Sequence, residues 1–335
     1  MTKFLIIRFS SIGDVVQCMN VIDDIVHRFP DAEIHWIARE EMTPLLRADG
    51  RVHAWGFDRE SGLRGLLRVA RRLKAERFDY LYDAHSNIRS GILKAVLLSP
   101  LEELLHRAPR HVTRHKERWK RFLLFRLGVN LFDKPFRGVD SYRKPLREWG
   151  ITRFDGPRAG WHFPPDFSAR LDGHVRENTI TLVPSANWEM KRWPVARWQE
   201  LVRLLPSRRF LLLAGPADAF CEEIRAVDPG RVTNLAGKTS LLESCYMIKI
   251  SRLVISADTG LLHVADLFDV PCLALMGPTA FGFPAGPRAT VIEADLPCRP
   301  CTKDGRGRCK RARSCMEEIT PGMVADRARS LAPVD

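Results

Sequence analysis

Long uninterrupted apolar runs are missing from this chain of 335 residues. No window offers the ~18 consecutive apolar residues that a membrane-spanning helix requires. The start, from Met1 to Arg8, has the pattern of a strand and lacks the cleavage pattern of a signal peptide. We therefore expect a cytoplasmic protein and neither a secreted nor an integral membrane protein.

A dinucleotide-binding fingerprint is also missing. The first expected strand-to-helix turn holds one glycine, Gly13, where a Rossmann dinucleotide site would show the pattern G-x-G-x-x-G. This absence disfavours an NAD-linked dehydrogenase and a nucleotide-sugar epimerase. Internal repeats and low-complexity tracts are absent too, so a repeat architecture is not expected.

The composition is that of a globular protein with a strong positive charge. Hydrophobic residues make up 45% of the chain, and its length favours two domains. The formal net charge of +13 calls for a polyanionic partner, which could be nucleic acid, an anionic membrane surface or an acidic substrate.

Much of this charge lies between His106 and Arg121, where seven Lys or Arg residues stand against one Glu. Such a run can simply be a solvated face. With Trp119 and Phe122 beside it, the run also suits docking on an anionic membrane or holding an acidic acceptor. No recognised nucleic-acid-binding motif accompanies the run, so nucleic acid is an unlikely partner.

Short apolar runs alternate with helical patterns, which is typical of a doubly wound α/β fold. Prolines interrupt the pattern between residues 150 and 178, where we place the linker between two α/β domains. The strands that we expect are Lys3–Phe9, Ala32–Ala38, Phe78–Tyr82, Thr179–Val183, Phe210–Ala214, Val232–Leu235 and Leu253–Ser256, with another beginning near Val270. The helices that we expect include Val15–Arg28, one ending at Leu98, one ending near Leu205, Leu241–Ser251 and Pro321–Leu331.

The stretch from Leu253 to Thr279 predicts a strand-helix-strand unit. Asp258 is a good helix N-cap, and Thr259 and Gly260 offer a hydroxyl and an approachable backbone at the helix N-terminus. Free N–H groups and the helix dipole favour an anion there, and His263 projects from the same end. Ordinary cap-and-turn chemistry is the alternative explanation of these residues.

Other polar residues follow expected strands, at the edge where open parallel sheets bind ligands. Asp14 follows the first strand, although the helix dipole alone would favour an acid there. His85, Asn87 and Arg89 follow a later strand and could bind a sugar, but capping explains them equally well. Lys191 could reach phosphates held by the turn at Thr259 and Gly260, with an exposed loop lysine as the alternative.

Four of the eight cysteines lie within eighteen residues, in the spacing C-x2-C-x7-C-x5-C. A disulfide framework is not expected in a cytosolic chain. Four thiolates in a short loop fit a structural Zn or Fe site, and the alternative is reduced thiols without metal. The expected ligands are Cys298, Cys301, Cys309 and Cys315.

Five ordered motifs resemble glycosyltransferase family 9, the family of ADP-heptose:lipopolysaccharide heptosyltransferases, and its heptosyltransferase II type in particular. They are residues 6–16, the Lys-Arg-Trp-Pro at 191–194, residues 256–265, the Met-Gly-Pro-Thr at 276–279 and the cysteine cluster ending in Cys315-Met316. The resemblance covers essentially the whole chain.

This resemblance implies a GT-B fold with two Rossmann-like doubly wound domains that face a central cleft. Residues 1–165 would bind the acceptor and residues 166–320 the nucleotide sugar. The last helix, residues 321–335, would pack back on the first domain. The implied activity is an inverting transfer of heptose from ADP-heptose to the lipopolysaccharide inner core, at the cytoplasmic face of the inner membrane and without a catalytic cofactor.

The resemblance also implies residue roles. Asp14 would be the general base and Lys191 the phosphate-binding lysine, both catalytic. The expected acceptor-binding residues are Ser11, Gly13, His85, Asn87 and Arg89. The expected donor-binding residues are Ser185, Lys191, Asp218, Thr239, Leu241, Asp258, Thr259, Gly260 and His263. A plain turn is the alternative role for Asp218, and Ala186 stands where the family often has a second hydroxyl.

A competing hypothesis is a protein that binds an anionic glycolipid or nucleic acid on the same scaffold without catalysis. Asp14 and Lys191 are both present, which argues against a loss of donor chemistry. Turnover with ADP-heptose would distinguish the two.

Overall fold

The computed structural model describes residues 1–98, 100–104, 108–156, 160–309, 311 and 314–333. The chain forms two compact units. The first unit comprises Met1–Glu117 and Val139–His162, and the second comprises Arg118–Gly138 and Phe163–Asp335. The first unit thus ends close to the expected boundary at residue 165, but residues 118–138 group with the second unit.

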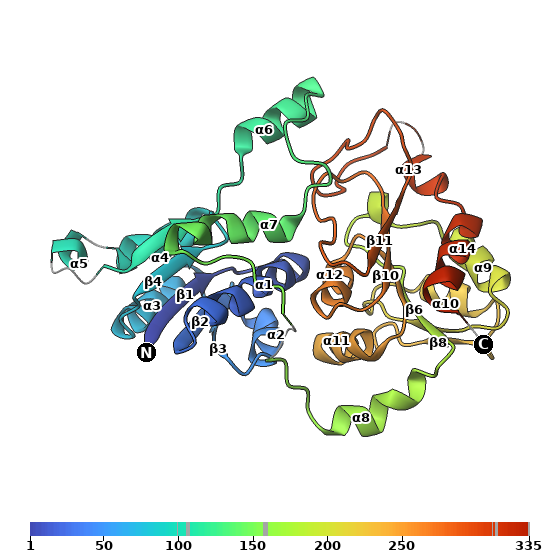
Figure 1. Cartoon of the computed structure of the whole chain (residues 1–335), viewed down its shortest axis with the longest axis horizontal. Helices are drawn as coiled ribbons and strands as arrows, with labels where there is room; N and C mark the ends of the chain where they lie inside the picture. Colours follow the sequence, from blue (N-terminus) through green and yellow to red (C-terminus); the bar gives the residue numbers. More distant parts are fainter. Residues whose placement is uncertain (99, 105–107, 157–159, 310, 312–313, 334–335) are drawn as a thin grey trace. The chain divides into compact units, whose positions relative to one another are not determined.

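The first unit is built on a five-stranded parallel sheet with the order β3-β2-β1-β4-β5, and Figure 1 labels the first four strands in that order. Residues Phe4 to Ile7 of the central strand are completely buried or nearly so, because helices cover both faces of the sheet. The strands are β1 (Thr2–Ile7), β2 (Ala32–Arg39), β3 (Val52–Phe57), β4 (Tyr80–Asp83) and β5 (Arg110–Thr113).

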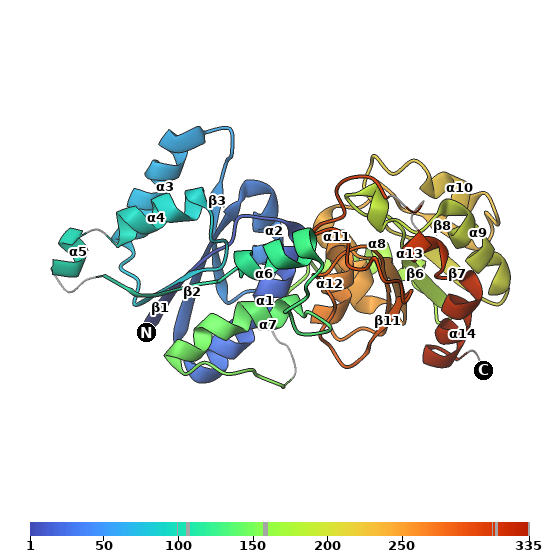
Figure 2. The ribbon, with the colours of Figure 1, turned by 90° about the horizontal axis from the view of Figure 1, so that it is seen from above.

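Helices cover the two faces of this first sheet (Figure 2). On one face, α3 and α4 pack Leu66, Leu73 and Leu93 against Leu5 and Ile7. On the other face lie α1 and α7. The helices are α1 (Ile12–Arg28), α2 (Thr43–Arg47), α3 (Gly62–Ala75), α4 (Ile88–Leu97), α5 (Pro100–Leu104) and α7 (Gly138–Arg143), with short 3-10 turns at Glu40–Met42 and Lys144–Trp149.

The second unit is built on a six-stranded parallel sheet with the order β11-β10-β9-β6-β7-β8. Its central strands β6 and β9 are buried along their whole length. The strands are β6 (Thr179–Val183), β7 (Arg209–Leu212), β8 (Val232–Asn234), β9 (Val254–Ala257), β10 (Cys272–Met276) and β11 (Ala289–Glu293).

The helices of the second unit also form two layers. In Figure 1, α9, α10 and α14 lie on one side of the sheet, and α11 and α12 lie on the other. The helices are α6 (Arg118–Phe122), α8 (Asp166–Leu171), α9 (Val195–Leu204), α10 (Cys221–Arg225), α11 (Leu241–Ile250), α12 (Gly260–Leu267), α13 (Ser314–Glu317) and α14 (Pro321–Leu331). A π-helical turn, η2 (Leu123–Leu127), continues α6, and 3-10 turns occupy Asp172–His174 and η5 (Glu189–Lys191).

The last helix belongs to the second unit, and its expected packing on the first domain stays a prediction. Helix α14 packs on α9, and its apolar residues Val324, Ala325 and Ala328 belong to the core of the second unit. The chain just before α14 is also held there, because the indole N–H of Trp193 donates to the carbonyl of Ile319 at 2.9 Å. The apolar face of α14 therefore completes the layer begun by α9.

The predicted fold class is confirmed. Each unit has a doubly wound parallel sheet with helices on both faces, as the alternating pattern indicates. Among the helices of the described residues, none combines the length and the apolar character needed to cross a membrane.

Candidate functional site

Candidate site residues lie at the switch point of each sheet, where the strand order reverses and ligands of open α/β sheets bind. In the first unit this point falls between β1 and β4, which lead to Asp14 and His85. In the second unit it falls between β6 and β9, which lead to Lys191 and to the turn at Asp258.

Asp14 lies in the first turn of α1 and is held by three side chains. It accepts hydrogen bonds from the hydroxyl groups of Tyr142 at 2.8 Å and Ser11 at 3.1 Å. It also pairs with the guanidinium of Arg8 at 2.5 Å. The side chain of Asp14 is still 38% exposed, so a ligand can reach this fixed carboxylate.

The surroundings keep Asp14 ionised. Burial favours the neutral acid, but the guanidinium groups of Arg8 and Arg114 and the hydrogen bonds from Tyr142 and Ser11 outweigh burial and hold the pKa of Asp14 far below its ordinary value. Asp14 is therefore a carboxylate at any physiological pH.

His85 is fixed in one neutral form. Its Nδ1 accepts from the backbone N–H of Phe9 at 3.3 Å, which leaves Nε2 to carry the proton. Burial and the nearby cations Arg8 and Lys116 lower the pKa of His85 to about 3. His85 can therefore donate a hydrogen bond to a ligand but cannot serve as a base through Nδ1.

The other acceptor candidates differ in their roles. Asn87 caps α4 in a reciprocal pair with Ser90, so the capping explanation holds for this residue. The side chain of Arg89 is exposed. Ser11 precedes α1 without a capping bond of its own and donates to Asp14, and Gly13 lies half-buried in the same first turn.

Three residues around Asp14 were missed by the sequence analysis. Arg8 is 4% exposed and also donates to the carbonyl of Ala84 at 3.0 Å. The guanidinium of Arg114 stacks 3.7 Å from the centre of the Tyr142 ring. Arg8 could have been identified from the sequence, because it is a charged residue near the end of an otherwise apolar strand. Tyr142 and Arg114 are far from Asp14 in the sequence, so no local pattern indicated them.

The expected capping role of Asp258 is wrong. Thr259 occupies the position before α12, and the carboxylate of Asp258 instead accepts from the Thr279 hydroxyl at 2.7 Å. The same oxygen pairs with the ammonium of Lys191 at 2.9 Å, and Asp258 is only 5% exposed. The structure thus brings Lys191 to the N-terminus of α12, as expected, through an ion pair that the sequence did not reveal.

A glycine allows the chain to pass close to this turn. Gly282 has a φ of +101°, and a Cβ added there would lie 3.3 Å from Asp258 Oδ1 and 3.7 Å from His263 Nε2. His263 is buried in the first turns of α12, beside Thr259 and Gly260. The turn therefore combines a cation, a carboxylate, an imidazole and the N–H groups of a helix end.

A second polar turn, from Gly215 to Asp218, binds two residues that lie near Lys191 in the sequence. Asp218 accepts from Ser185 at 2.6 Å and from the backbone N–H of Gly215 at 3.0 Å, and it pairs with Arg192 at 3.2 Å. Both carboxylate oxygens of Asp218 therefore have partners within the protein, as a purely structural role in a turn would require. Ser185 is one of these partners.

The remaining two donor candidates lie at the start of α11. The hydroxyl of Thr239 lies 2.9 Å from that of Ser244, and Leu241 is the first residue of the helix and half-buried. The backbone N–H of Gly237 donates to the carbonyl of Ala214 at 3.0 Å, which places the Thr239 turn beside the Asp218 turn.

The cysteine-rich loop contacts the stem of Lys191. Gly305 has a φ of +89°, and a Cβ added there would lie 2.6 Å from Lys191 Cγ. The guanidinium of Arg306 lies 4.7 Å from the centre of the Trp188 ring. The loop therefore forms one wall beside the phosphate-binding candidate.

The four cysteines of this loop do not form a closed tetrahedral site in the structure. Within the described residues, no three of their sulfur atoms lie within 4.8 Å of one another. Cys315 is buried, which raises its pKa to about 11, whereas Cys301 is exposed. A metal bound by all four would require the loop to rearrange.

One group with metal-ligand spacing does occur in the described residues, at Glu33, His35 and His53. Its hydrogen bonds oppose metal binding. His35 Nδ1 accepts from the indole N–H of Trp55 at 3.0 Å, so Nε2 carries the proton and donates to Glu33 at 2.7 Å. His35 therefore has no free lone pair for an ion.

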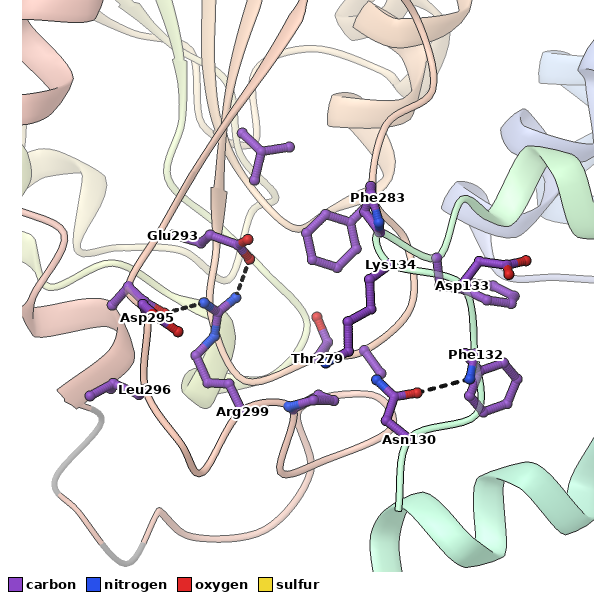
Figure 3. A pocket seen from close by; sticks show the side chains of 16 residues that line it. Asn130, Phe132, Asp133, Lys134, Thr279, Phe283, Glu293, Asp295, Leu296 and Arg299 are labelled. Atoms are coloured by element: carbon purple, nitrogen blue, oxygen red, sulfur yellow. Dashed lines mark hydrogen bonds and ion pairs between the residues drawn. The ribbon is translucent and has the colours of Figure 1, made fainter. Parts of the chain in front are cut away.

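A cavity of about 420 Å³ opens in the second unit beside the Asp258 turn (Figure 3). Thr279, which donates to Asp258, also lines this cavity. Figure 3 shows Glu293 and Arg299 on one side, paired at 2.6 Å, and Lys134 and Phe283 on the other. The cavity therefore offers room for a polar group next to the turn.

Comparisons with known proteins identify the family and the fold of this chain. The model of glycosyltransferase family 9 (heptosyltransferase) matches residues 66–309. Lipopolysaccharide heptosyltransferase 1 of Pseudomonas aeruginosa is 25% identical, over 90% of this chain and 86% of that protein. The solved structure of Escherichia coli ADP-heptose lps heptosyltransferase II has a TM-score of 0.74 and 23% identity, and covers 99% of this chain and 98% of its own. It supports the predicted GT-B fold.

A more distant solved structure shares the fold. The iron-containing dodecameric glycosyltransferase TibC of enterotoxigenic Escherichia coli has a TM-score of 0.60 and 13% identity, and covers 98% of this chain and 76% of its own. This likeness shows a shared fold. With the family model matching well over half of its residues, the chain belongs to glycosyltransferase family 9 (heptosyltransferase) and is a glycosyltransferase.

Proposed function

We propose that this enzyme moves heptose from ADP-heptose to the inner core of lipopolysaccharide, in the Kdo and heptose region, with inversion at the anomeric carbon. Family membership and the names of its relatives support the sugar and the acceptor. The observation that carries the mechanism is the pair of switch-point sites, a fixed carboxylate in one unit and a cationic helix end in the other.

Asp14 is the general base of the proposed mechanism. Inversion needs an acceptor hydroxyl to attack from the face opposite the leaving ADP, and a carboxylate takes up its proton as the new C–O bond forms. Arg8 and Tyr142 hold Asp14 in place and ionised. These contacts also make Asp14 a weaker base, since a carboxylate with a depressed pKa accepts a proton less readily.

Lys191 and the N-terminus of α12 bind the donor diphosphate. Negative charge builds on the departing ADP, and preorganised donors of this kind can each contribute roughly 3 kcal/mol. Lys191 pairs with Asp258, which positions its ammonium beside Thr259 and Gly260 before any donor arrives. His263 supplies a further hydrogen-bond donor at the same end of the helix.

The remaining donor contacts come from the two adjoining turns. Ser185 and Asp218 lie near the phosphates and the ribose, and Thr239 and Leu241 line the adenine pocket. Since Ser185 already donates to Asp218, it contributes to phosphate binding only by exchanging that bond.

The acceptor side is formed by Ser11, Gly13, His85, Asn87 and Arg89. The fixed Nε2–H of His85 can donate to a sugar hydroxyl or to an acidic group of the acceptor. Asn87 contributes chiefly by shaping the turn, because its side chain caps α4. The acceptor is a lipid, so the enzyme works as a peripheral protein at the cytoplasmic face of the inner membrane.

A metal takes no part in the proposed reaction. If Zn or Fe binds Cys298, Cys301, Cys309 and Cys315, its role is structural, because four protein ligands leave no position for diphosphate. Metal analysis of the purified protein, with and without the four cysteines, tests this point.

The test of function is a panel of nucleotide sugars offered with truncated core acceptors. We expect transfer from ADP-heptose, and an anomeric configuration in the product opposite to that in the donor. Binding of donor and acceptor without turnover would instead identify a non-catalytic glycolipid-binding protein. Transfer from a different nucleotide sugar would refute the assignment of ADP-heptose.

A further inference from the structure

Large apolar side chains gather on the surface of one short segment of the second unit. Eleven large hydrophobic residues are exposed in the described part of the chain, and five of them lie between residues 119 and 131. These are Trp119 (58% exposed), Phe122 (59%), Leu127 (64%), Val129 (45%) and Leu131 (47%). Single exposed apolar residues are ordinary, but a cluster of this kind marks an interaction surface.

The fold keeps these side chains outside by burying the opposite face of the helix. Helix α6 runs directly into η2, which ends at Leu127 and is followed by the capping residue Gly128, whose φ is +71°. Leu124 on the inner side is 6% exposed, and the ring of Phe125 lies 6.1 Å from that of Phe281. The outward direction of Trp119 and Phe122 is therefore set by the packing of their neighbours.

The chain after the helix is held in the same way. Phe132 and Phe136 pack edge-on against Phe281, with ring centres 5.1 and 4.9 Å away. The guanidinium of Arg121 lies 4.3 Å from the centre of the Phe281 ring. Figure 3 shows Phe132 on the segment that follows the helix. Residues 118–131 thus form a fixed surface rather than a loose loop.

The charge on this surface has one sign. Its cations are Arg118, Lys120, Arg121 and Arg126, and no acidic residue occurs from 118 to 132. Arg118 and Arg126 are exposed beside the apolar side chains. Aromatic and aliphatic side chains flanked by Lys and Arg are the pattern of an element that lies in the interface of an anionic bilayer.

We propose that residues 118–131, here called the docking surface, bind an anionic phospholipid bilayer by inserting Trp119 and Phe122 between headgroups. A second copy of the chain fits this surface poorly, because two such surfaces would repel one another and the whole chain carries +13. The inference deepens the proposed function, in which the acceptor is a lipid in that bilayer.

The first test measures binding to vesicles by flotation. Wild-type protein should bind vesicles of phosphatidylethanolamine and phosphatidylglycerol, and should bind phosphatidylcholine vesicles weakly. The double variant Trp119→Ala/Phe122→Ala should partition onto vesicles at least about tenfold more weakly. Its two truncated side chains no longer gain free energy by moving from water into the bilayer. Leu63→Ala on α3 is the matched control, because Leu63 is 57% exposed and lies outside the docking surface.

The second test addresses charge. Arg118→Gln/Arg126→Gln should weaken binding to anionic vesicles by roughly fivefold for each cation removed, and higher salt should shrink that difference. The matched control is Arg64→Gln/Arg68→Gln on the cationic helix α3, where both arginines are exposed. Equal losses in the two double variants would mean general electrostatic attraction and would overturn the proposal.

Hydrogen exchange and sedimentation complete the test. Backbone amides of residues 118–131 should exchange more slowly on anionic vesicles than in solution. Unchanged vesicle binding by the Trp119→Ala/Phe122→Ala variant would reject the docking surface. So would a dimer of the wild type that this variant abolishes, since the surface would then serve a second copy.

Activity on a water-soluble acceptor separates this inference from the proposed function. The docking variants should turn over a core acceptor without acyl chains as fast as wild type, because none of their altered residues belongs to the candidate site. If the heptosyltransferase assignment fails, neither wild type nor any variant transfers heptose, but the docking variants still bind vesicles more weakly than wild type. If the docking surface fails, wild type and variants transfer heptose, and the docking variants bind vesicles as well as wild type does.

Discussion

Replacing Asp14 by asparagine tests the proposed base with the least disturbance of its surroundings. The amide keeps the size of the carboxylate, and its single oxygen can still accept from one of the two hydroxyl groups of Tyr142 and Ser11, which bond to different oxygens of Asp14 at 2.8 and 3.1 Å. The proton acceptor is lost, and general-base catalysis contributes about 10²- to 10⁴-fold. We therefore expect turnover to fall by at least about a hundredfold, or about 2.7 kcal/mol in the barrier.

The same change also affects stability, and the two effects must be separated. Arg8 is only 4% exposed and would lose its counter-charge. Breaking a fully buried pair costs ~3–5 kcal/mol, but the side chain of Asp14 is 38% exposed, so solvent reduces the cost to roughly 1–2 kcal/mol. Denaturant unfolding measures this loss independently of turnover.

The assay is ADP release from ADP-heptose with a core acceptor, compared with ADP binding by calorimetry. Asp14→Asn and Asp14→Ala should both lose turnover while binding ADP as wild type does, because the proposed donor-binding residues lie in the other unit. Turnover within about tenfold of wild type in a folded variant would remove Asp14 from the base role. Loss of ADP binding would show instead that the substitution acts through the fold.

Three further outcomes follow from the contacts of the site. In Tyr142→Phe the pKa of Asp14 should rise, because the carboxylate loses a hydrogen bond that favours its charged form, so the pH–rate profile should fall off at a higher pH on its acid side. Lys191→Ala should weaken ADP binding about ten- to a hundredfold by calorimetry, and unchanged affinity would reject its phosphate role. Arg143→Ala should lower the free energy of unfolding by ~3–5 kcal/mol, since it strands buried Asp24, to which Arg143 donates at 2.7 Å; a loss under about 1 kcal/mol would contradict this.

The sequence predicted most of the elements because their local patterns are strong. Thr179–Val183 and Pro321–Leu331 have the predicted bounds, and other expected strands and helices differ by a few residues. Strands β3, β5 and β11 were not expected. They lie at sheet edges and are only partly buried, so their sequences are less uniformly apolar and predict a strand less strongly.

Packing between distant elements is where sequence reasoning failed. The apolar stripe of α14 indicates that the helix is half-buried, but the stripe does not identify its partner. Trp198 on α9 and Val324 on α14 share a core although they are far apart in the sequence. The core of the second unit provides that partner.

Asp258 shows the same limit at the level of chemistry. An aspartate just before a helix fits a cap, because a cap depends only on neighbours in the sequence. Its carboxylate lies 2.9 Å from the ammonium of Lys191 and accepts from Thr279, residues that only the folded sheet brings near. In the proposed mechanism, a diphosphate arriving at the helix end therefore competes with Asp258 for Lys191. That competition lowers the affinity for donor, but it holds the lysine in position before binding, so less conformational entropy is lost when the diphosphate forms its bonds.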